Sequence, residues 1–136
     1  MKLIVDASVA IKWFVEEHGT ELADRLIDVE AALVAPDTIL AEIGNALWKR
    51  YHRRELSARH ASEAIRRAPG LFSSLSPTPA LALEALRIAT TVDHPIYDCF
   101  YLALAEREAA PLVTADRRLL SLSGRLPHLD IRPLAA

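Results

Sequence analysis

The sequence predicts an α/β fold in which helices cover both faces of a central parallel sheet. Short apolar runs alternate with longer helical segments, an order that is typical of parallel strands joined by crossover helices. Hydrophobic residues make up 51% of the 136 residues, which suits a sheet that is buried on both faces. This length fits one domain of common size, so we expect residues 1–136 to form a single domain.

Five short apolar runs are the expected strands. The first, KLIV at residues 2–5, stops at Asp6 and is typical of a strand buried on both faces. Residues 129–134 are expected to form the last strand, at an edge of the sheet. The three remaining strands are expected at residues 32–35, 72–75 and 112–114.

The segments between these runs are expected to be helical. Asp37 and Ser57 are positioned to cap the helices that follow them, by accepting free amide hydrogens of the first turn. Pro95 stands where the first turn of a helix tolerates proline, and Pro111 ends that helix. The expected helical ranges are residues 7–15, 21–29, 37–53, 57–68, 80–91, 96–109 and 116–122.

The composition argues against several classes of protein. No run of about 18 uncharged apolar residues exists, so we expect no membrane-spanning helix. Cys99 is the only cysteine, which rules out an internal disulfide and favours a reducing cytoplasm. The net charge of -2 does not by itself indicate nucleic-acid binding, although residues 49–54 form a local basic cluster.

Two aspartates follow expected strands directly. Asp6 comes after the first strand, and Asp116 comes two residues after the strand that ends at Thr114. Ligand sites in open parallel sheets lie at the carboxyl ends of the strands, so these two carboxylates are expected to meet at one edge. The alternative is that each aspartate only caps the helix that follows it.

Glu42 and Asp98 lie on expected helices, where their carboxylates need an explanation. Glu42 lies on the border of the apolar stripe of its helix and is expected to face the sheet, although a salt-bridged boundary residue is the alternative. Asp98 lies within IYDCFYLALA, which is apolar on almost every face, so we expect it to be buried. A buried carboxylate needs a partner or a metal, unless the dipole of the first helical turn stabilises it.

The chemistry of such a group favours a hard metal ion. Several carboxylates at one place repel one another and do not all ionise without a cation. Oxygen ligands suit Mg²⁺ or Mn²⁺, whereas the scattered histidines and the lone Cys99 disfavour zinc. Metal-bound carboxylate centres cleave phosphodiesters, because the ion activates a water and offsets charge on the phosphate. The sequence therefore favours a metal-dependent nuclease.

Four sequence segments carry a family resemblance. KLIVDASVAIKWF, PDTILAEIGNALWK, HPIYDCFYLALAE and PLVTADRRLL occur in this order and span nearly the whole chain. Together they resemble a PIN-domain ribonuclease of the VapC type, the toxin of a type II toxin–antitoxin system. The resemblance implies a three-layer α/β/α PIN-like fold with a five-stranded parallel sheet. It implies that Asp6, Glu42, Asp98 and Asp116 are catalytic and hold Mg²⁺ or Mn²⁺, supported by the hydroxyls of Ser8 and Thr114.

The same resemblance implies an endoribonuclease that hydrolyses RNA through a metal-activated water. It also implies a cognate VapB-type antitoxin and a homodimer as partners. Basic side chains would contact RNA phosphates, and exposed aromatic rings would stack on bases. The candidates for these contacts are Arg117, Arg118, Lys49, Arg66, Arg67, Trp48 and Tyr51.

Two alternatives remain open. In the first alternative, the basic cluster at residues 49–54 is only a solvated helix end, where positive charge suits the dipole, and Trp48 is part of the core. In the second alternative, the whole chain is a PIN-fold module that binds RNA or protein without cleaving RNA. The intact set of four carboxylates argues against the non-catalytic module. A phosphoaspartate-forming phosphatase is disfavoured because Ser8 stands where its second aspartate is usual.

Overall fold

A five-stranded parallel sheet forms the centre of the computed structural model, which describes residues 1–135. The strand order is β3-β2-β1-β4-β5, so β1 is central and the last strand is at an edge, as expected. Each neighbouring pair of strands is parallel. The strands are β1 (Lys2–Val5), β2 (Ala32–Pro36), β3 (Ser74–Ser76), β4 (Leu112–Thr114) and β5 (Ile131–Pro133).

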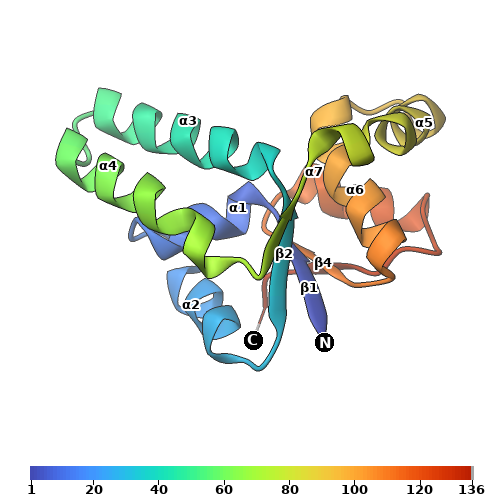
Figure 1. The fold of residues 1–136 in the computed structure, drawn as a ribbon, viewed down its shortest axis with the longest axis horizontal. Coiled ribbons are helices and arrows are strands. Elements are labelled where there is room, and N and C mark those ends of the chain that lie inside the picture. Colours follow the sequence, from blue (N-terminus) through green and yellow to red (C-terminus); the bar gives the residue numbers. More distant parts are fainter. Residues whose placement is uncertain (136) are drawn as a thin grey trace.

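Helices cover both faces of this sheet (Figure 1), which confirms the predicted three-layer α/β/α fold. One layer contains α1 (Ala7–Ala10), α2 (Thr20–Asp28), α3 (Thr38–His52) and α4 (Ala58–Arg67). The opposite layer contains α5 (Ala82–Val92), α6 (Ile96–Glu108) and α7 (Arg117–Leu120). Short 3₁₀ turns lie at Ile11–Trp13, Ala68–Leu71, Thr78–Ala80 and Ser121–Gly124.

The core lies where the central strands meet α6. Ile4 and Val5 of β1 are fully buried, as a central strand between two helical layers must be. Helix α6 contacts β1, β2, β4 and α5, which explains why its sequence is apolar on nearly every face. Within residues 1–135, no helix is long and apolar enough to cross a membrane.

Two predicted elements differ from the structure. The single helix expected over residues 7–15 is the short α1 followed by a 3₁₀ turn that ends at Trp13. The strand expected at 72–75 is β3, which is shifted to Ser74–Ser76. Sequence pattern alone misplaces β3 because Phe72 is buried although it precedes the strand, and the backbone pairing begins only at Ser74.

One of the two predicted helix caps is correct. Ser57 has extended backbone geometry, and its side chain accepts a hydrogen bond from the His60 amide at 3.0 Å. Asp37 was expected to do the same for α3, but its side chain makes no capping bond. The reason is conformational, because Asp37 is already helical at φ -66° and ψ -14°, whereas a capping side chain needs an extended backbone.

Candidate active site

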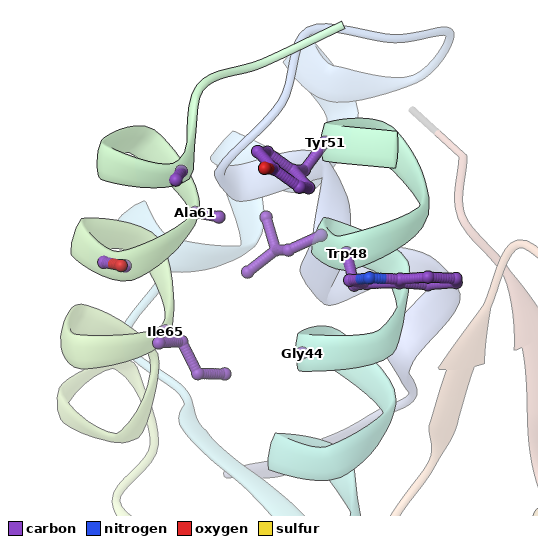
Figure 2. Close-up of a pocket in the computed structure, with 8 residues that line it drawn as sticks. Gly44, Trp48, Tyr51, Ala61 and Ile65 are labelled. Carbon is purple, nitrogen blue, oxygen red and sulfur yellow. The ribbon is translucent and has the colours of Figure 1, made fainter. Parts of the chain in front are cut away.

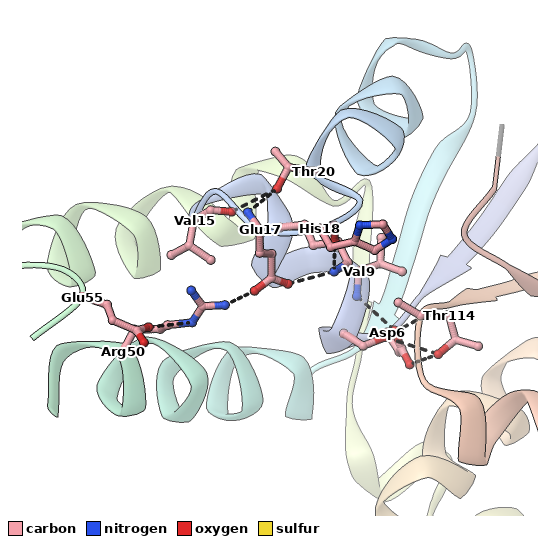
Figure 3. Close-up of polar contacts among 12 residues, drawn as sticks. Asp6, Val9, Val15, Glu17, His18, Thr20, Arg50, Glu55 and Thr114 are labelled. Carbon is pink, nitrogen blue, oxygen red and sulfur yellow. Dashed lines mark hydrogen bonds and ion pairs between the residues drawn. The ribbon is translucent and has the colours of Figure 1, made fainter. Parts of the chain in front are cut away.

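The carboxyl ends of β1 and β4 build the centre of the site. Val5 pairs with Val113, so Asp6 and Thr114 follow at the same edge of the sheet. The hydroxyl of Thr114 donates to Asp6 Oδ2 at 2.5 Å, and the hydroxyl of Ser8 donates to Asp6 Oδ1 at 2.6 Å. Figure 3 shows Asp6 and Thr114 facing one another across this edge. Both carboxylate oxygens of Asp6 are therefore oriented by hydroxyl donors.

Asp6 also caps α1, and it is buried. Its Oδ1 accepts a hydrogen bond from the Val9 amide at 3.3 Å, so the capping alternative is correct as far as it goes. Capping does not explain the burial, because only 5% of Asp6 is exposed. Burial raises the pKa of Asp6 to about 6, against hydrogen bonds that lower it, and the charge of Asp98 adds to the rise.

Glu42 extends from α3 toward the same edge, where a tyrosine of the opposite helical layer holds it. The hydroxyl of Tyr101 on α6 donates to Glu42 Oε2 at 2.5 Å. Burial raises the pKa of Glu42 to about 7, with further contributions from the charges of Asp6 and Asp98. Tyr101 was not predicted, although a phenol within the apolar middle of α6 signals a need for a buried partner.

Asp98 lies in the first turn of α6, as expected, but it is not fully buried. Its side chain is 29% exposed, because the start of α6 projects to the open edge of the sheet. His94 Nε2 lies 2.7 Å from Asp98 Oδ2, and the His94 side chain is only 8% exposed. His94 was missed as a site residue, and its position just before the Pro95 that starts α6 was the available signal.

Asp116 is connected to this centre through Thr114. Its backbone amide donates to Thr114 Oγ1 at 3.0 Å, and its carboxylate accepts from the Arg118 amide at 2.8 Å. Asp116 therefore caps α7, in the way that Asp6 caps α1. No contact joins the Asp116 carboxylate to Asp6, Glu42 or Asp98 within residues 1–135, so its role as a metal ligand stays a prediction.

The three other carboxylates act on one another electrostatically. Asp98 raises the pKa of both Asp6 and Glu42, and Asp6 raises that of Glu42, which places Asp6, Glu42 and Asp98 in one group. In the described part of the chain, no three His, Cys, Asp or Glu side chains converge tightly enough to enclose an ion. The group nevertheless fits Mg²⁺ or Mn²⁺, because Mg²⁺ keeps several waters and needs only one or two carboxylates directly.

The basic residues predicted to contact RNA fall into three places, one of which is the last turn of α4, where Arg66 and Arg67 are exposed. Arg117 and Arg118 are exposed at the start of α7, directly after Asp116. Lys49 is exposed on α3, about 10 Å along the helix from Glu42 at 1.5 Å per residue. The arginines at the start of α7 therefore directly follow a predicted site residue, whereas Lys49 lies about two helical turns from one.

The end of α3 has a different character from that expected. Trp48 is 55% exposed, so the core alternative for it is wrong, and its ring stacks on His52. Arg50 forms ion pairs with Glu17 and Glu55 (Figure 3). Between α3 and α4 lies an apolar hollow of about 280 Å³ (Figure 2), to which Trp48 and Tyr51 both contribute. The hollow is lined by Gly44, Leu47, Trp48, Tyr51, Ala58, Ala61, Ser62 and Ile65.

Comparison with known protein families identifies the class of protein to which this fold and this acidic edge belong. The PIN domain family matches residues 3–124, and the chain belongs to that family. Among its curated relatives is ribonuclease VapC3 of Pyrobaculum aerophilum, which is 32% identical over 121 residues, 88% of this chain and 92% of the relative. The chain is thus similar in particular to the VapC ribonucleases of the PIN family.

Solved structures support the same fold. The crystal structure of PAE2754 from Pyrobaculum aerophilum matches with a TM-score of 0.70 and 26% identity, over 98% of this chain and 84% of that one. VapBC2 from Rickettsia felis, solved with a DNA fragment from its promoter, matches with a TM-score of 0.68 over 98% of both chains. Its identity is only 13%, so this second likeness concerns the fold alone.

The contact between Tyr101 and Glu42 leads to a first prediction. Tyr101→Phe removes only the hydroxyl that orients Glu42, so we expect Mn²⁺ affinity to fall by roughly tenfold, a usual effect of losing an outer hydrogen bond to a ligand. Isothermal titration calorimetry with Mn²⁺ measures this. Tyr51→Phe, at an exposed tyrosine of α3, is the matched control. Equal Mn²⁺ affinity in the wild type and Tyr101→Phe would remove Tyr101 from the site.

Proposed function

We propose that this protein is a metal-dependent endoribonuclease and the toxin of a VapBC-type pair. One observation carries the proposal, namely that Asp6, Glu42 and Asp98 share one edge of the sheet, and that within residues 1–135 no lysine or arginine forms an ion pair with them. Burial is the main cause of the raised pKa values of Asp6 and Glu42, and the negative charges of neighbouring carboxylates add to it, a charge that a bound Mg²⁺ or Mn²⁺ would offset. Similarity to ribonuclease VapC3 supports RNA as the substrate.

Each residue has a definite task in this proposal. Asp6, Glu42, Asp98 and Asp116 hold the metal, which when bound activates the attacking water and offsets charge on the phosphate. Ser8 and Thr114 hold the two oxygens of Asp6 in place, and Tyr101 does the same for Glu42. His94 occupies Asp98 Oδ2 and so leaves Oδ1 for the metal. These contacts preorganise the ligands, so little rearrangement is needed when the ion binds.

Cleavage of an RNA pool tests the proposed function. Purified protein is incubated with mixed single-stranded and structured RNA in Mg²⁺, in Mn²⁺ and in EDTA, and products are resolved by sequencing gel. We expect internal cuts with either metal and none with EDTA, because the carboxylates alone supply no activated water. Gel mapping of the new ends then gives the sequence preference of the enzyme.

A second candidate function makes the opposite prediction. A non-catalytic PIN-fold module that binds RNA or protein would leave the pool intact under every condition and would show no Mn²⁺ affinity by calorimetry. Intact RNA together with measurable Mn²⁺ binding would instead indicate a substrate outside the pool. The buried carboxylate of Asp6 favours the nuclease, because a binding module has no need for this charge in its interior.

The partners belong to the same proposal. The VapBC2 structure from Rickettsia felis is that of a VapBC assembly, and we expect a VapB-type antitoxin to bind this chain in the cytoplasm in a comparable way. We also expect a homodimer. Leu83 and Leu86 on α5 are exposed, as is Tyr97 at the start of α6, and such apolar side chains suit an interface with a second copy.

A further inference from the structure

Two hollows adjoin the acidic centre, one on each side, and they differ in charge. The first lies beside Glu42 and has a volume of about 310 Å³, lined by Thr38, Ala41, Glu42, Asn45 and Tyr97. It contains a carboxylate and no cationic side chain. The second, which we call the β5-side hollow, has a volume of about 490 Å³ and lies next to Thr114 and the β5 residue Pro133. RNA phosphates are therefore repelled by the first hollow and not by the second.

The β5-side hollow begins at the catalytic edge itself. Thr114 and Ala115 belong to its wall. The same two residues contact the centre, because the Thr114 hydroxyl donates to Asp6 and the Ala115 amide donates to Ser8 Oγ at 2.9 Å. A polymer whose phosphate reacts at Asp6 would thus place its neighbouring unit in this hollow.

The cations in this wall exceed the carboxylates. Lys12 donates to Glu17 Oε1 at 2.9 Å and to the His18 carbonyl at 2.6 Å, which leaves one of its three ammonium protons available. Glu17 also pairs with Arg50, so its single charge is shared between two cations (Figure 3). The guanidinium of Arg117 takes part in none of the ion pairs found within residues 1–135.

The rest of the wall suits a sugar and a base. Leu22, Leu120 and Leu134 provide apolar surface, and the exposed imidazole of His18 stands beside them. Nucleobases that are not paired stack on aromatic rings, histidine included, while their phosphates bind arginine and lysine. The hollow therefore combines the two kinds of contact that single-stranded RNA uses.

We propose that the β5-side hollow binds the RNA nucleotide adjacent to the cleaved bond, with Arg117 and Lys12 on its phosphate and His18 on its base. This inference rests on the proposed function, because it assumes that the acidic edge cleaves RNA. It assigns a direction to the substrate, whose chain leaves the centre across β4 toward β5 and not past Glu42 along α3.

Fluorescence anisotropy with a labelled single-stranded RNA of mixed sequence, in EDTA and over a range of salt concentrations, tests this site. We expect Arg117→Ala to weaken binding about tenfold and to reduce the slope of log affinity against log salt by about 0.7, the loss of one phosphate contact. Leu22→Trp fills the hollow without changing charge, so we expect a similar loss of affinity with an unchanged salt slope. Arg59→Ala, at an exposed arginine of α4 outside the hollow, should bind like the wild type.

The outcomes separate this inference from the proposed function. Wild-type protein that cuts the RNA pool, together with wild-type affinity in both Arg117→Ala and Leu22→Trp, would overturn the hollow alone. Wild-type protein that neither binds nor cuts RNA would overturn both. If the two variants lose affinity only for an acidic peptide and keep full RNA affinity, the hollow belongs to a protein partner and the inference is wrong. Melting temperatures of each variant verify that it is folded.

Discussion

Asp98→Asn is expected to lower RNA cleavage by roughly a thousandfold, equivalent to about 4 kcal/mol of transition-state stabilisation. The substitution preserves the volume of the side chain. It removes one negative charge from the group formed by Asp6, Glu42 and Asp98, and it replaces one carboxylate oxygen with an amide nitrogen. The oxygen Oδ2 of Asp98 is occupied by His94, so the other oxygen is the one available to a metal. The initial cleavage rate with saturating Mg²⁺ measures the effect, and circular dichroism verifies the fold.

Asp93→Asn is the matched control for this experiment. Asp93 is exposed at the end of α5 with φ 52°, a left-handed conformation that asparagine also accepts. It undergoes the same chemical change five positions away and lies outside the carboxylate group, so its cleavage rate should remain that of the wild type. Wild-type cleavage in Asp98→Asn would refute the catalytic role of Asp98, whatever the behaviour of the control.

Glu42→Gln should have two opposite effects, loss of cleavage and a gain in stability without metal. Glutamine keeps an oxygen that can accept the Tyr101 hydroxyl, but it carries no charge that burial would desolvate and that Asp6 and Asp98 would repel. We expect the melting temperature of the metal-free variant at pH 8.5 to exceed that of the wild type by about 4 °C, corresponding to about 1 kcal/mol. Differential scanning calorimetry in EDTA measures this difference.

The pH dependence of this difference follows from the pKa of Glu42. The folded-state pKa is about 7, whereas the ordinary value is 4.5, so between these limits the folded chain holds a proton that the unfolded chain has released. Stability of the wild type therefore falls as pH rises through this window, and the penalty is complete above it. At pH 4.5 the advantage of Glu42→Gln should vanish. Glu30→Gln, at an exposed glutamate, should match the wild type throughout.

An advantage of Glu42→Gln that is equally large at pH 4.5 and pH 8.5 would contradict the electrostatic explanation. A packing effect would behave in that way, because packing does not depend on the protonation of Glu42. Asp6 contributes in the same sense as Glu42, because burial raises its pKa to about 6 as well. Titrating the metal-free wild type from pH 8.5 to pH 5 should therefore raise its melting temperature even without any substitution.

The sequence predicted the carboxylates of this edge better than it predicted the residues that contact them. Asp6 was predictable because it closes an apolar strand, which is a local signal, and parallel pairing then brings it to Thr114. The contact between Glu42 and Tyr101 spans 59 positions and crosses from one helical layer to the other, so neither helix pattern contains it. Periodicity also predicted full burial for Asp98, because it cannot reveal how far the first turn of α6 extends past the sheet.

The clearest difference between sequence pattern and structure concerns which carboxylate is buried. Sequence pattern assigned the costly buried carboxylate to Asp98, in the most apolar segment of the chain. The structure instead buries Asp6, between two helical layers at a strand end that looks unremarkable in the sequence. What decides the desolvation of a carboxylate is its depth in the assembled layers, and the hydropathy of its sequence neighbours reports that depth only indirectly.

The hydrogen bond from Thr114 to Asp6 joins residues that are 108 positions apart. A ribosome making this chain from its N-terminus therefore releases Asp6, Ser8 and Glu42 long before Thr114 and Asp116 emerge. Until then β1 lacks β4 as its neighbour, and the hydroxyls of Ser8 and Thr114 cannot both donate hydrogen bonds to Asp6. Nascent chains and translation products that end before Thr114 should thus be inert, because the proposed site is complete only after β4 has emerged.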